Sequence, residues 1–95
     1  MRTINLADVT AKIKEMFIDA CENIPQNVLD TIKDAEKQEE SPLGKEVLGK
    51  IIENDLLARE KHLPICQDTG VAVVYLTIGS EVTFTGYIYE AVNEG

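Results

Sequence analysis

Five consecutive residues near the middle of the chain carry groups that could do chemistry: Cys66, Gln67, Asp68, Thr69 and Gly70. The thiolate of Cys66 is a soft donor of the kind that binds iron–sulfur centres. The carboxylate of Asp68 could exchange protons with a bound molecule, and the amide of Gln67 could orient that molecule. Together these groups fit the addition or removal of water at a metal-activated substrate.

The residues on either side of this stretch predict a loop between a helix and a strand. Pro64 disfavours helical backbone in the residue before it, so the preceding helix should end there. Gly70 permits a positive φ angle or a close approach by a ligand. Polar residues at such a junction are where a scaffold typically displays a functional site.

Other interpretations of the same stretch stay open. Cys66 could be a nucleophile with His62 as its base, although Pro64 lies between them and nothing in the sequence places them face to face. A zinc site is disfavoured because one histidine and two distant cysteines do not supply the usual four ligands. In a purely structural role, Asp68 and Thr69 would cap a turn while Cys66 fills a gap.

The composition limits the classes of partner. Ninety-five residues suit a single domain, 1–95, and 44% hydrophobic with 27% charged residues is an ordinary globular balance. A net charge of −8 opposes binding to nucleic acid or to an anionic membrane surface. No apolar run reaches the length of a membrane span and the start lacks a secretory signal, so we expect a cytoplasmic protein.

The two cysteines, Cys21 and Cys66, do not form a disulfide framework in a chain of this kind. Cys21 falls on the apolar side of a predicted helix. We therefore expect it to be a buried small hydrophobe rather than a ligand.

Apolar residues at spacings of three and four predict three amphipathic helices within residues 1–62. The first begins after a cap at Asn5 and ends at Pro25. The second starts at or near that proline and runs to about Lys37. Ser41 and Pro42 form the cap and first position of the third.

The remainder predicts a site loop over 63–70, a β-hairpin over 71–84 and a short helix over 85–95. Residues 71–78 form an apolar, β-branched run without alternation, which is typical of a strand buried on both faces. The expected fold is α+β, a bundle of three helices followed by the hairpin and a C-terminal helix. A chain of this length has few residues that could cover a strand buried on both faces. We therefore expect it to be a truncated piece of a larger domain that is cut at Gly95.

The heptapeptide Pro64-Ile65-Cys66-Gln67-Asp68-Thr69-Gly70 resembles the signature of class I, iron–sulfur-dependent fumarases and the related L-tartrate dehydratase alpha subunits. Residues 52–54 and 90–95 are also similar to segments of that family. The resemblance is clear over roughly the second half of the chain, and in the first half it rests on the helical pattern alone.

The resemblance implies a [4Fe-4S] cluster held by three cysteines, with one iron open to act as a Lewis acid. Cys66 would be the first cluster ligand. Gln67 and Asp68 would contact a dicarboxylate substrate, and Asp68 would also be the candidate for proton transfer. The other two cysteines and the substrate-clamping arginines of the family would lie beyond Gly95, and Cys21 matches neither cysteine.

The leading hypothesis is therefore the N-terminal part of a hydro-lyase alpha subunit, inactive alone, from an enzyme that hydrates fumarate to malate or dehydrates tartrate. Its expected partners are the rest of the alpha subunit, a beta subunit or C-terminal domain, and further copies in a homo-oligomer. The alternative is a non-catalytic helical module whose apolar hairpin serves subunit assembly.

Overall fold

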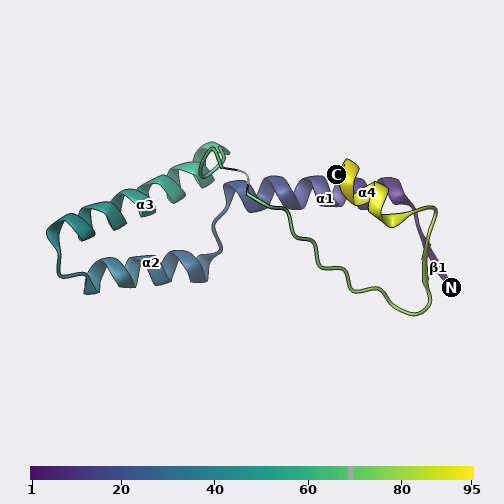
Figure 1. Ribbon diagram of the computed structural model, residues 1–95, viewed down its shortest axis with the longest axis horizontal. Coiled ribbons are helices and arrows are strands. Elements are labelled where there is room, and N and C mark those ends of the chain that lie inside the picture. Colours follow the sequence, from purple (N-terminus) through teal and green to yellow (C-terminus); the bar gives the residue numbers. More distant parts are fainter. Residues whose placement is uncertain (69) are drawn as a thin grey trace. The chain divides into compact units, whose positions relative to one another are not determined.

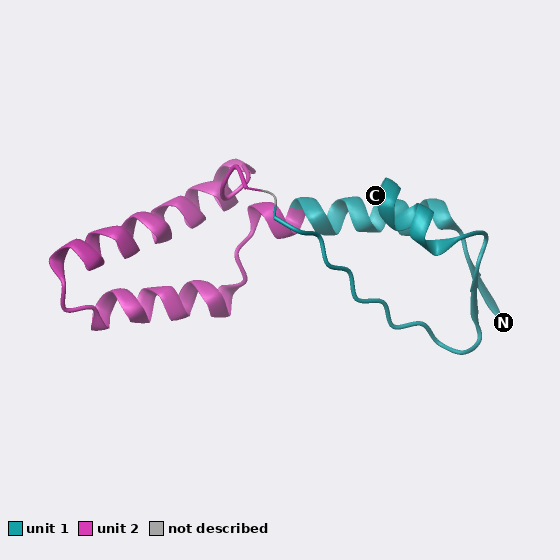
Figure 2. Cartoon of the chain, in the orientation of Figure 1, with its two compact units in different colours: residues 1–18, 70–95 teal, residues 19–69 magenta. Residues whose placement is uncertain are grey.

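The structure, a computed structural model, describes residues 1–68 and 70–95 and divides the chain into two compact units (Figures 1 and 2). One unit comprises residues 1–18 and 70–95, and the other comprises residues 19–69. In chain order the elements are β1 (Arg2–Ile4), α1 (Leu6–Glu22), α2 (Gln26–Gln38), α3 (Pro42–Lys61), β2 (Val82–Phe84) and α4 (Ile88–Glu94). This confirms the predicted α+β class.

The unit of residues 19–69 is built around α2 and α3, which run side by side as a helical hairpin (Figure 1). Leu29 of α2 is completely buried, and Ala58 of α3 is 4% exposed. The side chain of Ser41 caps α3 by accepting a hydrogen bond from the Gly44 N–H at 3.2 Å, with Pro42 at the first helical position. The predicted start of this helix is confirmed.

The helical character predicted for residues 1–62 is confirmed. All three predicted helices form, but α2 packs with α3 while most of α1 belongs to the other unit. The expectation for Cys21 was wrong, because this residue is exposed. Spacing along a helix identifies an apolar face but not whether another element covers it.

The β-hairpin predicted over 71–84 does not form. Residues 71–78 have neither helix nor strand structure, and β2 pairs in parallel with β1 at the opposite end of the sequence. A turn joins Gly79 to Val82, but the hydrogen-bonding partner of β2 is β1, with the Arg2 N–H donating to the Glu81 carbonyl at 2.9 Å. A pairing across 80 residues leaves no local pattern in the sequence.

The predicted terminal helix does form, as α4, and it packs on α1. The Thr10 hydroxyl donates a hydrogen bond to the Ala91 carbonyl at 3.0 Å. Ile13 and Ala91 are the buried apolar residues of this unit among those described. None of the described helices has both the length and the apolar character needed to cross a membrane.

Candidate functional site

The loop that contains Cys66 begins at a tight C-terminal cap of α3. His62 ends the helix in the left-handed conformation, with φ 55° and ψ 48°, and the Leu63 N–H returns to the Ala58 carbonyl at 3.0 Å. The chain is thereby turned out of the helix just before Pro64, which cannot continue it. The predicted helix end before Pro64 is confirmed.

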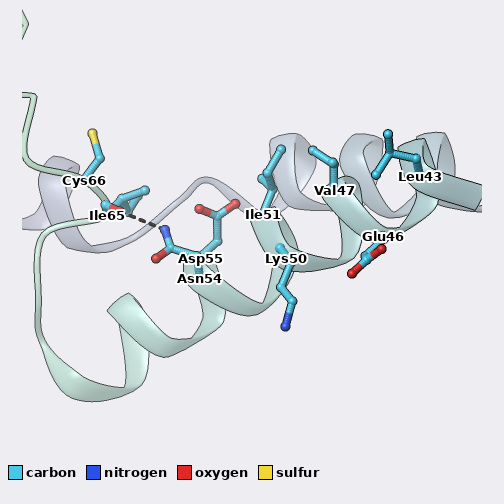
Figure 3. A pocket seen from close by; sticks show the side chains of 9 residues that line it. All are labelled: Leu43, Glu46, Val47, Lys50, Ile51, Asn54, Asp55, Ile65 and Cys66. Atoms are coloured by element: carbon cyan, nitrogen blue, oxygen red, sulfur yellow. Dashed lines mark hydrogen bonds between the residues drawn. The ribbon is translucent and has the colours of Figure 1, made fainter.

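Ile65, the residue before Cys66, is held through both of its backbone polar groups. Its N–H donates to the Cys21 carbonyl at 2.9 Å, and its carbonyl accepts from the Asn54 side-chain amide at 2.8 Å (Figure 3). The Cys21 carbonyl is one of the last four of α1, which have no partner within the helix. Two helices thus fix the position at which the loop begins.

Cys66, Gln67 and Asp68 are all exposed. The Cys66 thiol donates a weak hydrogen bond to the Asp68 carbonyl at 3.4 Å, which brings the two ends of this short segment together. Gly70 has φ 59°, the first of the two possibilities that the sequence left open. An added Cβ there would meet no atom within 4 Å, so the backbone angle rather than lack of space favours glycine. Thr69, which was expected to help cap a turn, lies outside the described residues.

A groove of about 580 Å³ lies beside this loop, along α3 (Figure 3). Cys66 and Ile65 line one end of it. The remaining lining side chains come from α3 and are Leu43, Glu46, Val47, Lys50, Ile51, Asn54 and Asp55. The thiol therefore adjoins a largely apolar surface that opens to solvent.

Asp55 is a buried carboxyl group in this groove, with 4% of its surface exposed. Burial raises the pKa of Asp55, and the positive charge of Arg59 partly opposes that rise. The guanidinium of Arg59 donates to the Ile24 carbonyl at 2.8 Å, so it ties α3 to the connection between α1 and α2. Arg59 is thus occupied by a structural contact.

The side chain of His62 contacts Glu22. Its Nδ1 atom lies 3.7 Å from a carboxylate oxygen of Glu22, with 80% of the His62 side chain exposed. This contact gives no support to a pair in which His62 serves as the base of a nucleophilic Cys66.

The described residues contain no complete set of metal ligands. No group of three or more His, Cys, Asp or Glu side chains that could hold a metal ion occurs among residues 1–68 and 70–95. The exposed thiol of Cys66 could provide one ligand without disturbing the core, because nothing buries it. The other ligands of a cluster would have to come from outside these residues, and the roles of Cys66, Gln67 and Asp68 stay predictions.

Two residues near the loop were missed as parts of the site. In the sequence, Asn54 drew attention only as part of the segment 52–54 that is similar to the family, and Asp55 was not singled out. A signal for Asp55 exists: it lies three and seven residues after Ile52 and Leu48, in the stripe predicted to be buried. A carboxylate in such a stripe is unusual unless it is paired or functional.

Comparison with known proteins gives a consistent result. The family model described as "Fumarate hydratase (Fumerase)" matches residues 10–95. A protein of Methanocaldococcus jannaschii named "Putative L(+)-tartrate dehydratase subunit alpha" is 38% identical over 85 residues, which is 87% of this chain and 30% of that protein. No solved structure matches. The chain belongs to the fumarate hydratase family, and it spans about a third of the length of the curated relative that it matches.

Proposed function

We propose that this chain is the N-terminal part of the alpha subunit of an iron–sulfur hydro-lyase that interconverts fumarate and malate or dehydrates a tartrate-like acid. The observation that carries the proposal is the exposed thiol of Cys66 within a family-type loop that two helices hold in place. By this proposal the segment is inactive alone, because a cluster needs several ligands and the described residues contain no group of three or more metal-binding side chains.

In the complete enzyme Cys66 binds one iron of a [4Fe-4S] cluster. When bound, such a cluster supplies a Lewis acid that polarises the substrate. The side chains of Gln67 and Asp68 contact the dicarboxylate, and Asp68 takes up or releases the proton that accompanies movement of water. A dicarboxylate also needs cations beside it, and by this proposal the rest of the enzyme supplies them.

The partners follow from the same proposal. The relative from Methanocaldococcus jannaschii is named as a subunit alpha. By analogy, this chain works with the rest of its own alpha subunit and with a beta subunit or an equivalent C-terminal domain. The exposed apolar residues of the chain are consistent with assembly into an oligomer.

The site assignment is tested in the complete enzyme, purified without oxygen and assayed with fumarate, malate and tartrate. Cys66→Ser should lose the visible absorption of the cluster and all turnover, because the ligand is removed. Asp68→Asn should keep the absorption and lower turnover by about 10²- to 10⁴-fold, the usual contribution of a general acid–base group.

Cys21→Ser is the matched control, because it removes the other exposed thiol. It should leave both absorption and turnover unchanged. A Cys66→Ser enzyme with full cluster content and activity would refute the ligand assignment. If Asp68→Asn also lost the cluster, its proposed role in proton transfer would be replaced by one in cluster binding.

The second candidate is a non-catalytic assembly module. It is favoured by the exposed apolar run after the loop, where Val71 is 90% exposed and Tyr75 is 91% exposed. Under this alternative the wild-type complex would contain no cluster and show no turnover, yet charged substitutions such as Val73→Lys would still prevent assembly.

A further inference from the structure

The side chain of Asn54 ties α3 to the loop that contains Cys66. Its side-chain amide reaches from α3 to the carbonyl of Ile65, 11 residues further along the chain and directly before Cys66 (Figure 3). We propose that Asn54 is a positioning residue that holds the loop so that the Cys66 thiol is presented to the iron–sulfur cluster. This inference rests on the proposed function.

The geometry makes Ile65 the fixed point of the loop. Its carbonyl is held at 2.8 Å by Asn54, and its N–H is held at 2.9 Å by the Cys21 carbonyl. Both peptide groups that flank the Ile65 Cα are therefore anchored, and the second of them leads directly into Cys66. Contacts with two helices therefore fix the backbone immediately before Cys66.

The chemistry of the contact requires a donor at position 54. The Ile65 carbonyl can only accept, so an amide N–H suits it and a carboxylate does not. Asn54→Asp keeps nearly the same shape but places a negative oxygen against the carbonyl. Asn54→Leu keeps nearly the same volume and removes hydrogen bonding altogether.

The role is distinguishable from simple support of the fold. Asn54 is exposed, and α3 continues on both sides of it, so its replacement should have little effect on helix packing. Residues that orient a metal ligand without touching the metal typically change metal affinity or activity by about 10- to 100-fold. The prediction is therefore a local change in the loop and a labile cluster, with the fold intact.

The first experiment needs no cluster. Hydrogen exchange of the Ile65 amide is measured by NMR in the 95-residue chain. Exchange requires the loop to open, and in Asn54→Leu and Asn54→Asp this opening breaks one hydrogen bond fewer. Each variant should therefore accelerate the exchange by about fivefold, the factor that corresponds to one ordinary hydrogen bond. Asn27→Asp serves as the matched control, since it makes the same chemical change at an exposed position of α2 and should leave Ile65 unaffected.

The second experiment uses the complete enzyme with its cluster. Loss of visible absorption is followed after addition of an iron chelator. Asn54→Leu should lose the cluster about tenfold faster than wild type. Asn27→Asp should match wild type, and the urea midpoints of all variants should agree.

The outcomes separate this inference from the function on which it rests. Unchanged Ile65 exchange in both Asn54 variants would overturn the anchoring role. Faster exchange with normal retention of the cluster would overturn the link to Cys66 while leaving the hydro-lyase proposal standing. A wild-type enzyme without any cluster would overturn both, and the exchange data would then describe only a structural hydrogen bond.

Discussion

At the scale of single residues, Asp55 shows how burial changes a side chain's chemistry. Its pKa is raised above the ordinary value of 3.8, first by desolvation, with the Arg59 charge acting in the opposite direction. The folded state therefore holds this proton more tightly than the unfolded state. The free energy of unfolding accordingly falls as the pH rises from the ordinary pKa of Asp55 to its raised pKa in the folded state. Above that raised pKa the full cost of burying the charged carboxylate is present.

Asp55→Asn should increase the free energy of unfolding at about pH 7 by about 1 kcal/mol, because the buried charge is removed. The gain should vanish at about pH 3, where the wild-type carboxyl is also neutral. Urea titrations at both pH values test this. Glu53→Gln, at an exposed position of the same helix, is the control and should show no such pH-dependent gain. A less stable Asp55→Asn protein at neutral pH would mean that attraction to Arg59 exceeds the cost of burial.

At the scale of elements, the C-terminal cap of α3 has an unfavourable backbone conformation. His62 has a φ of 55°, a conformation that costs a residue with a Cβ about 1–2 kcal/mol and that glycine adopts freely. Its contact with Glu22 offsets little of this, because the His62 side chain is 80% exposed.

His62→Gly should therefore raise the free energy of unfolding by about 1 kcal/mol, measured by thermal or urea denaturation. His62→Ala is the matched control, since it also removes the contact with Glu22 but keeps the Cβ. The alanine variant should show no gain. Equal stability of the two variants would indicate that the left-handed cap is not a source of strain.

The elements also show how far local sequence patterns reach. The caps and prolines predicted α2 and α3 to within about two residues, because capping acts over only a few positions. The positive φ of Gly70 was one of two possibilities anticipated for the same local reason. The parallel pairing of β1 with β2 was not, because the two strands are separated by most of the chain and each is only three residues long.

At the scale of the whole molecule, residues 71–78 have the composition of a strand but pair with no strand among the described residues. The run is rich in β-branched and aromatic residues, yet Val71 and Tyr75 are about nine-tenths exposed. A strand is stable only when its backbone groups are paired. We expect the rest of the proposed larger subunit to supply the neighbouring strands.

This expectation is tested by hydrogen exchange in the 95-residue chain and in the complete subunit. The amides of residues 71–78 should exchange rapidly in the former and become protected in the latter, by about 10²-fold or more for a core strand. The Thr85 N–H, bonded to the Ile4 carbonyl at 3.1 Å, is the internal control and should be protected in both. Continued rapid exchange of residues 71–78 in the complete subunit would contradict a role as a buried strand.

In the candidate site, too, some features follow from the sequence and others only from the tertiary structure. The types of Cys66, Gln67 and Asp68 made cluster and acid–base chemistry one of several interpretations, because a thiolate and a carboxylate keep their chemical character wherever the chain places them. The family resemblance favoured that interpretation, which stays a prediction. The two hydrogen bonds that anchor Ile65 depend on contacts of the loop with two helices, α1 and α3.

Helices, caps and the chemistry-bearing loop could thus be read from short stretches of residues, since capping, proline geometry and side-chain chemistry act locally. Only the tertiary structure showed that the chain's first strand pairs with β2, that Cys21 is exposed and that Asn54 reaches Ile65. Those outcomes depend on which surfaces meet when distant segments pack, and no spacing along the sequence records that.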